Sequence, residues 1–364
     1  MPFIPGGEQL DLMTLSLNAT LDGGKLSEYN VHSLHGLKMA EGTNKFMTKY
    51  QPNKKPFIMT KNTFAGSGKY SQHLLGETHR TWENMTNTIA GVMNFNMFGI
   101  PVTGPDTCGY YSQGNKTRET EELCARWIQL ATYYPFARQH RDDNPEGALE
   151  PYLMTELYKN WTRNAMHQRL NVARHFYTCL YKVSQDGGTC FDPLLFHFPE
   201  DDVTFNNIEH SFIYANTLKI TPVLDYETSK SFYQRSYFPK GEWVNFNDLN
   251  DIVKSKGGED GWKDLHTPSG AQDVINAHIM PGAIMLKQEG SFNTTSDLNL
   301  TNNPITLIAN RDSQGYASGL AYLDDGETSE KIMGENYEYY EFIISGNSIK
   351  KWNKNNGKFN STRG

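Results

Sequence analysis

The 364-residue sequence lacks the features of a membrane span, a leader peptide or a nucleic-acid-binding surface. No apolar run approaches the roughly 20 residues that a helix needs to cross a bilayer. The segment Met1–Gly7 has neither a basic nor an apolar region, so it does not predict a signal peptide. Charges of both signs are mixed, and with a net charge of −7 we expect no nucleic-acid partner.

Metal-binding patterns are missing as well. The histidines and cysteines do not cluster with the spacing of metal ligands. We therefore expect no metal ion, and nothing in the sequence predicts an organic cofactor.

Cysteine is scarce, and the four cysteines allow three pairings. The local pairs, Cys108 with Cys124 and Cys179 with Cys190, would each close a short loop. The alternative is a set of reduced, buried thiols, and the spacing alone does not decide between them.

Asparagine, by contrast, is plentiful and creates many Asn-x-Ser/Thr sequons. Their density favours a glycoprotein of the secretory pathway, lysosomal or extracellular, although sequons also arise by chance in an Asn-rich chain. The acceptor positions are Asn18, Asn84, Asn115, Asn160, Asn293, Asn299 and Asn360. Of these, Asn84 lies within a predicted helix, where we do not expect an acceptor.

The pattern of apolar residues divides the chain into an α/β part and an all-β part. In the first part, helices are predicted at about 27–50, 81–96 and 151–183, and another with Thr120 as its N-cap; strands are predicted at 57–60, 133–136 and 192–198. After about residue 218, short strand-like runs are separated by turn residues. These runs lie at 220–224, 232–238, 283–286, 306–309, 319–323 and 337–344.

The stretch Lys61–Tyr110 contains the strongest functional pattern. Each of its two polar, Gly-rich loops follows an apolar run, and a segment of helical period lies between them. Loops that follow the strands of βα units are where an α/β barrel carries its site. Both loops contain an acid, Glu77 in the first and Asp106 in the second.

These motifs resemble the catalytic barrel of glycoside hydrolase family 31, the α-glucosidase family. The family pattern reads roughly R-S-T-F-A-G-x-G-x-Y-x-x-H-W-x-G-D, which corresponds to Lys61–Glu77, and then G-x-P-x-x-G-x-D-x-C-G-F, which corresponds to Gly99–Tyr110. The resemblance continues through Glu121–Trp127, Tyr134–His140 and Asp324–Glu327, and so covers nearly the whole chain.

The resemblance implies an α/β plus all-β fold, in which the C-terminal part of a TIM (β/α)8 barrel is followed by two β-sandwich domains. We place the barrel at residues 1–217, a proximal sandwich at 218–290 and a distal sandwich at 291–364, with Ser291–Asn303 as a linker. The resemblance also implies a disulfide between Cys108 and Cys124, just behind the active-site loop.

Glu77 stands at the position of the family's acid/base, the Asp of H-W-x-G-D. Retaining hydrolysis of a glycoside needs two carboxyls about 5–5.5 Å apart, one a nucleophile and one an acid/base. The extra methylene of Glu moves the carboxyl by roughly a bond length, and a displacement of about 1 Å can lower a rate on the order of 100-fold. The alternative is that Glu77 is a solvated loop acid.

Asp106, His140 and Tyr110 match sugar-binding positions of the family. The family's Asp binds hydroxyls in the −1 subsite, which suits a carboxylate because it accepts two hydrogen bonds from vicinal hydroxyls. The family's His also contacts a hydroxyl, and Tyr110 replaces a subsite Phe whose ring stacks on the sugar. The alternatives are a turn or N-cap role for Asp106 and an ordinary surface position for His140.

Several positions depart from the family pattern together. Lys61 replaces an Arg and does not supply the same fork of donors. Leu74 replaces a Trp, which removes a stacking wall, and His79 replaces a second Trp. We retain Lys61 and Leu74 as substrate-binding positions.

The family's nucleophile motif, W-x-D-M-N-E, does not occur in this sequence. A half barrel would leave open sheet edges and a bare core. We therefore expect the N-terminal half of the barrel as a partner, in cis or as a processed chain, an α-glucoside as substrate, and an isolated chain that is inactive. The rival interpretation is a degenerate, non-catalytic homologue that binds sugar or serves as a subunit.

Overall fold

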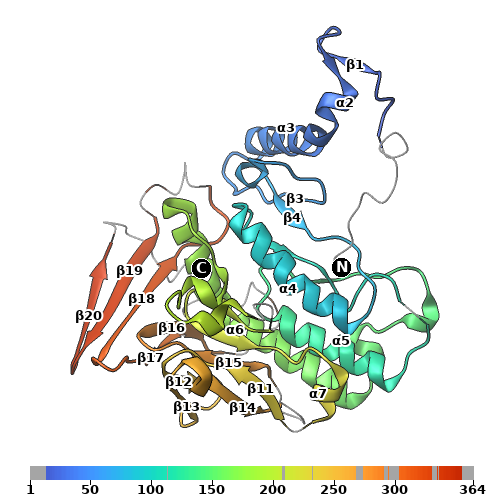
Figure 1. Ribbon diagram of the computed structural model, residues 1–364. Coiled ribbons are helices and arrows are strands. Elements are labelled where there is room, and N and C mark those ends of the chain that lie inside the picture. Colours follow the sequence, from blue (N-terminus) through green and yellow to red (C-terminus); the bar gives the residue numbers. More distant parts are fainter. Residues whose placement is uncertain are drawn as a thin grey trace.

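The computed structural model describes residues 14–112, 114–206, 210–231, 233–267, 274–290, 294, 303–329, 334 and 336–354. Helices and short parallel strands form the first part of the chain, and mostly antiparallel sheets form the second (Figure 1). The predicted class, α/β followed by all-β, is confirmed.

Short parallel strands carry the loops of interest. β3, β4 and β5 pair in that order, and β6 pairs with β7, all in parallel. Parallel neighbours end at the same edge, so the loops that follow these strands emerge together. The bounds are β3 (Met59–Thr60), β4 (Gln72–Leu74), β5 (Thr103–Gly104), β6 (Asp106–Thr107) and β7 (Arg138–Gln139). The strand predicted at 133–136 thus forms slightly later, as β7.

Three long helices accompany these strands: α4 (Trp82–Met97), α5 (Arg118–Ala131) and α6 (Glu156–Asp186). The helix predicted at 81–96 is confirmed, and the Thr81 hydroxyl caps it by accepting from the backbone N–H of Asn84. The N-cap of α5 is Thr117 rather than Thr120, and Thr120 completes a capping box on the Thr117 backbone. No helix in the described ranges is both long and apolar enough to span a bilayer.

The first described segment forms a hairpin, β1 (Thr20–Leu21) with β2 (Leu26–Ser27), and then two helices, α2 (Glu28–Val31) and α3 (His35–Tyr50). The hairpin and α2 project away from the rest of the molecule, whereas α3 contacts the turn Ser67–Lys69 (Figure 1). The helix predicted at 27–50 is therefore present but interrupted by a 3-10 turn, His32–Leu34.

One hydrophobic core runs through both parts of the chain. Trp127 of α5 is fully buried in a cluster with Met85 and Ile89 of α4. The same cluster contains Phe191 and Phe212, which belong to the C-terminal sheets. Removing either part would therefore expose the core face of the other.

The second part begins with a six-stranded antiparallel sheet in the order β13-β12-β15-β10-β9-β8. A β11–β14 pair packs on it through Tyr237, Trp243 and Leu265. The short helix α7 (Tyr226–Lys230) precedes β11. The strands are β8 (Phe191–Pro193), β9 (Phe212–Tyr214), β10 (Leu218–Thr221), β11 (Tyr233–Tyr237), β12 (Gly241–Asn245), β13 (Ile252–Ser255), β14 (Trp262–His266) and β15 (Asn276–Ile279).

A five-stranded sheet in the order β17-β16-β18-β19-β20 follows and packs on α6 (Figure 1). Among the described strands of this sheet, β16 and β18 pair in parallel and the other neighbours pair antiparallel. A second layer, as in the predicted distal sandwich, is not present in the described part of the chain. The strands are β16 (Ala283–Gln288), β17 (Ile305–Asn310), β18 (Tyr316–Leu323), β19 (Glu338–Ser345) and β20 (Ser348–Asn353).

The sheets do not divide where the sequence analysis places its boundaries. The segment predicted as the last barrel strand pairs antiparallel with β9, with Asp192 opposite Ile213. β16, expected in the proximal sandwich, instead pairs with β17 and β18. An apolar run predicts a strand but not its partner, which explains both differences. The predicted linker, Ser291–Asn303, lies almost wholly outside the described residues.

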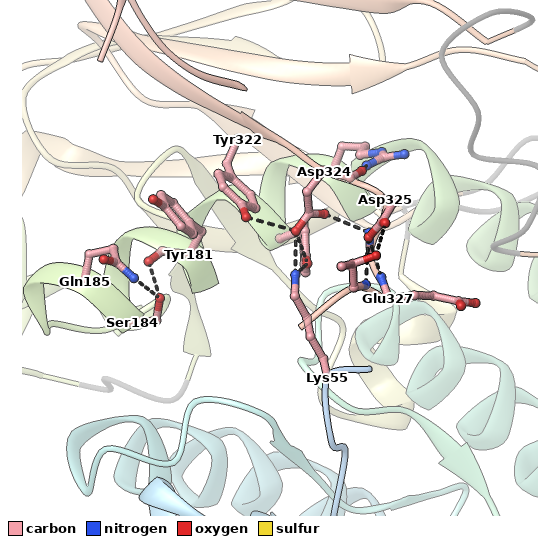
Figure 2. Close-up of polar contacts among 12 residues, drawn as sticks. Lys55, Tyr181, Ser184, Gln185, Tyr322, Asp324, Asp325 and Glu327 are labelled. Carbon is pink, nitrogen blue, oxygen red and sulfur yellow. Dashed lines mark hydrogen bonds and ion pairs between the residues drawn. The ribbon is translucent and has the colours of Figure 1, made fainter. Parts of the chain in front are cut away.

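Covalent and polar links fasten α6 to its surroundings. Cys179 of α6 is bonded to Cys190, just before β8, and none of the cysteines is free. Asp324, after β18, is buried, and its Oδ2 accepts from Lys55 Nζ at 2.5 Å and from the hydroxyls of Tyr177 (3.0 Å) and Tyr322 (2.9 Å) (Figure 2). Because Tyr177 lies on α6 and Lys55 just before β3, this network joins three distant parts of the chain.

Candidate active site

The predicted site residues lie where parallel strands end. Lys61 follows β3, Leu74 is the last residue of β4, Asp106 lies two residues after the end of β5, and His140 directly follows β7. Glu77 lies on the loop after β4. The structure thus brings the five positions to one edge of the parallel strands.

Backbone hydrogen bonds connect the loops that carry these residues. The N–H groups of Tyr110 and Tyr111 donate to the Thr78 carbonyl at 2.8 and 3.1 Å. The N–H of Asp142 donates to the Tyr110 carbonyl at 3.0 Å. The loops after β4, β6 and β7 therefore form one continuous surface.

Arg80 is the buried centre of that loop surface. Its Nε donates to the Cys108 carbonyl at 2.9 Å and its Nη1 to the Gly147 carbonyl at 2.7 Å. Gly109 packs against it with φ of +73°, and a Cβ there would come within 2.7 Å of the Arg80 backbone, so only glycine fits. The predicted disulfide from Cys108 to Cys124 is present and ties this loop to α5.

Asp106 is fully buried and forms an ion pair. Its Oδ1 lies 2.8 Å from Arg138 Nε and 2.6 Å from Arg138 Nη2. Its Oδ2 accepts no hydrogen bond from any described residue, and His140 Nδ1 lies 3.6 Å from it. Burial raises the pKa of Asp106, while Arg138 and His140 act in the opposite direction. One carboxylate oxygen is thus held by arginine, and the other has no donor among the described residues.

His140 is oriented by the same arginine. Arg138 Nη2 donates to His140 Nδ1 at 3.1 Å, so in the neutral ring the proton resides on Nε2. The Tyr110 ring lies 5.0 Å from the His140 ring at an angle of 59°. Nε2–H is therefore the group that His140 can donate to a ligand.

Glu77 forms an ion pair with Lys61 through Oε1. Both side chains are partly exposed. Glu77 is thus bound to Lys61 in this structure. To act as a proton donor, Glu77 has to leave Lys61 and form a hydrogen bond with the oxygen of a glycosidic bond.

The two positions that replace family tryptophans differ in exposure. Leu74 is buried and packs inward rather than forming an open wall. The His79 ring lies 5.0 Å from that of Tyr111, and the two residues form a β-bridge. Neighbouring His73 stacks on Phe95 at 3.7 Å, and burial lowers its pKa to about 4, so it is neutral at neutral pH.

The sequence analysis does not name two residues that organise the candidate site, Arg138 and Arg80. Arg138 is two residues before His140, and side chains two apart on a strand share a face, which was an available signal. Arg80 had no such signal, because its carbonyl partners come from separate loops. Within the described ranges, no group of three or more His, Cys, Asp or Glu could hold a metal ion.

Comparison with known proteins identifies the family of this chain. Residues 9–179 match the family described as glycosyl hydrolases family 31 TIM-barrel domain. Residues 187–285 match the glycosyl hydrolase family 31 C-terminal domain. The chain belongs to glycoside hydrolase family 31. The parallel strands β3 to β7 are accordingly part of a family 31 barrel, and the sheets after them are its C-terminal β domains.

Family 31 relatives match most of the chain but extend well beyond it. Human intestinal sucrase-isomaltase is 34% identical over 342 residues, covering 92% of this chain and 17% of its own length. Rat lysosomal alpha-glucosidase is 32% identical and covers 96% of this chain and 36% of its own length. Alpha-xylosidase 1 of Arabidopsis thaliana is 32% identical, with coverage of 96% and 37%. The chain thus spans well under half the length of these relatives.

Solved structures share the fold at lower identity. A glucosidase II alpha subunit with bound Glc1Man2 superposes with a TM-score of 0.82 at 22% identity, over 96% of this chain and 36% of that chain. A family 31 alpha-glucosidase from Bacteroides thetaiotaomicron gives a TM-score of 0.72 at 24% identity, over 94% and 51%.

Proposed function

We propose that this chain forms part of a retaining glycoside hydrolase of the α-glucosidase type. The observation that carries the proposal is the Asp106 site. A buried carboxylate is fixed through one oxygen by Arg138, and its other oxygen lies beside His140 without a donor among the described residues. A sugar hydroxyl supplies the missing donor, and the His140 Nε2–H supplies a donor for a neighbouring hydroxyl.

Glu77 is the proposed acid/base. It lies on the loop whose Thr78 carbonyl binds the Tyr110 and Tyr111 backbones, so it belongs to the same surface as Asp106. Tyr110 supplies a ring for the sugar face, and Lys61 neutralises Glu77 until substrate binds. The nucleophile is a carboxylate outside this set of residues, and the N-terminal half of the barrel is its proposed source.

The substrate class rests on the relatives. Two of those named above are glucosidase or sucrase-isomaltase enzymes and one is a xylosidase. We propose an α-linked glucoside, and a secretory location, lysosomal or extracellular. Among the sequon asparagines, Asn18 and Asn115 have exposed side chains that fit a glycoprotein.

A second candidate is a non-catalytic homologue that binds sugar or serves as a subunit. The Lys61–Glu77 ion pair favours it because the pair occupies the proposed proton donor. The burial of Leu74 favours it as well, because Leu74 presents no aromatic ring where the family has a Trp.

Release of 4-nitrophenol from 4-nitrophenyl α-glucoside tests the proposal, using the 364-residue chain and the longest product of its gene. We expect no turnover by the chain, and turnover by a longer product that Asp106→Asn abolishes. Sugar binding without turnover in the longest product would instead support the non-catalytic homologue. Absence of both binding and turnover would contradict both candidates.

A further inference from the structure

The series of parallel strands has an open edge at each end. β3 pairs with β4 and β7 pairs with β6, and neither strand has a second partner among the described strands. A TIM barrel closes its sheet with eight strands, so every strand has two neighbours. In a closed barrel, the strands that flank β3 and β7 therefore come from outside the described residues.

The helices beside these edges lack a neighbour for the same reason. In a barrel, a helix that connects two parallel strands packs back onto both of them. Helix α3 comes directly before β3, and α6 is the first long helix after β7. Within the described chain, no strand before α3 pairs with β3, and no strand after α6 pairs with β7. Each helix is thus left with a face that no barrel strand covers.

The uncovered face of α3 is an apolar stripe. Met39, Phe46 and Tyr50 follow each other at intervals of seven and four residues, and are 74%, 59% and 76% exposed. The rings of Phe46 and Tyr50 stack at 4.8 Å. The buried side of the helix contacts this chain, where a Cβ on Gly36 would come within 2.4 Å of Asn62. A contiguous apolar stripe of this kind marks a surface that another element covers.

A groove of about 450 Å³ lies at the other open edge. It touches three successive residues, Ala137, Arg138 and Gln139. Successive side chains of a strand point to opposite faces, so a space that touches all three runs along the edge of β7. Helices α5 and α6 form the other walls, and Met166 of α6 is 39% exposed. The apolar residues of the groove are Ile128, Ala131, Ala137, Pro151, Tyr152 and Met166.

We propose that the α3 stripe and the β7 groove are the two docking surfaces for the N-terminal half of the barrel. This inference rests on the proposed function, which assigns the nucleophile to that half. At each surface, a strand–helix unit of the N-terminal half adds a parallel strand to the open edge and places apolar side chains against α3 or α6. A segment that closes the ring of strands has to meet both ends of the series, which is where the two apolar surfaces lie.

The β7 groove places the docked half beside the sugar-binding residues. Arg138 lines the groove and also donates to Asp106 and His140. A second copy of this chain has open edges too, but it brings no nucleophile, because the sequence lacks the motif W-x-D-M-N-E. The N-terminal half is therefore the occupant that both closes the strands and completes the site.

Hydrogen exchange measured by mass spectrometry compares the 364-residue chain with the longest product of its gene. Peptides over residues 39–50 and 156–166 should exchange at least tenfold more slowly in the longer product, because docking covers both helices. Phe46→Glu should remove the protection of 39–50 and Met166→Glu that of 156–166, since each places a charge in an apolar contact. Ile349→Glu, at an exposed residue of β20, is the matched control and should change neither. Circular dichroism verifies that each variant is folded.

The proposal is overturned if either helix gains no protection, if the longest product is no longer than this chain, or if Phe46→Glu and Met166→Glu keep the protection. Dimerisation of the 364-residue chain that protects the same peptides identifies a second copy as the occupant and overturns it as well. Protection without turnover of 4-nitrophenyl α-glucoside supports the docking surfaces and contradicts the proposed enzyme. Turnover without protection contradicts the docking surfaces alone.

Discussion

Asp106 is the residue on which the proposed sugar contacts depend. The motif predicts Asp106 and His140 because they stand in a long pattern of characteristic residues. It does not predict that Arg138 fixes the orientation of both, since that contact joins positions that are 32 apart in the sequence. The sequence thus points to Asp106 and His140 as candidate site residues, whereas only the structure shows that Arg138 contacts both.

Asp106→Asn should weaken binding of maltose at least tenfold, measured by isothermal titration. The amide removes the acceptor pair and the charge that Arg138 and His140 face. Asp143→Asn is the control, because Asp143 is an exposed acid of the loop after β7. Equal affinities of the two variants would show that Asp106 does not contact the sugar.

Buried histidines should make the fold sensitive to mild acid. Burial lowers the pKa of His73 and His175 to about 4 and that of His278 to about 3. Unfolded histidines titrate near 6.5, so between about pH 6.5 and 4 the unfolded chain binds more protons. The free energy of unfolding should therefore fall as the pH is lowered through this window.

Urea denaturation at about pH 7, 5.5 and 4.5 measures this fall, and His278→Leu should reduce the proton uptake on unfolding by about one. Glu41 has a pKa lowered to about 2, so its own contribution is lost only below about pH 4.5, the lowest pH of these measurements. An unfolding free energy that does not change between about pH 6.5 and 4.5 would contradict this explanation.

At the level of elements, periodicity predicts helices well and strand partners poorly. α4 and α6 lie close to their predicted ranges because long amphipathic stripes define them. The start of α5 is displaced because two threonines, three residues apart, both suit an N-cap. The apolar residues of β8 suit a barrel strand as well as a strand of the C-terminal sheet, and only the tertiary fold selects β9 as its partner.

Arg80 should hold the loops after β4, β6 and β7 in place. Arg80→Met leaves the carbonyls of Cys108 and Gly147 without their donor, which should lower the free energy of unfolding by about 2–3 kcal/mol. It should also weaken maltose binding, because the Glu77 and Asp106 loops lose their common support. Arg163→Met, at an exposed arginine of α6, should change stability by less than about 0.5 kcal/mol. Equal stabilities of the two variants would count against this role.

The whole molecule depends on contacts between its two parts. The shared hydrophobic core and the hydrogen bonds of Asp324 connect the barrel segment, α6 and the five-stranded sheet that contains β18. The sequence predicted the order of the parts, but not that a lysine before β3 would pair with an aspartate 269 residues later.

Asp324→Asn should lower the free energy of unfolding by about 2–3 kcal/mol. This loss is smaller than the usual loss on breaking a fully buried ion pair, because the Lys55 side chain is partly exposed. The matched control is Glu327→Gln in the same loop, where an exposed pair with Lys54 should contribute less than about 0.5 kcal/mol. Urea denaturation of both variants provides the comparison, and similar losses from the two would show that burial of the network adds nothing.

The central claim, that Glu77 is the acid/base of a glycosidase, is tested most directly by leaving-group dependence in the longest product of the gene. Glu77→Gln should reduce kcat/KM for maltose by about 10²–10⁴-fold, and much less for 4-nitrophenyl α-glucoside, whose leaving group needs little protonation. Glu83→Gln, at an exposed acid of α4, should leave both rates unchanged. Equal rates of Glu77→Gln and the unaltered enzyme on maltose would contradict the claim.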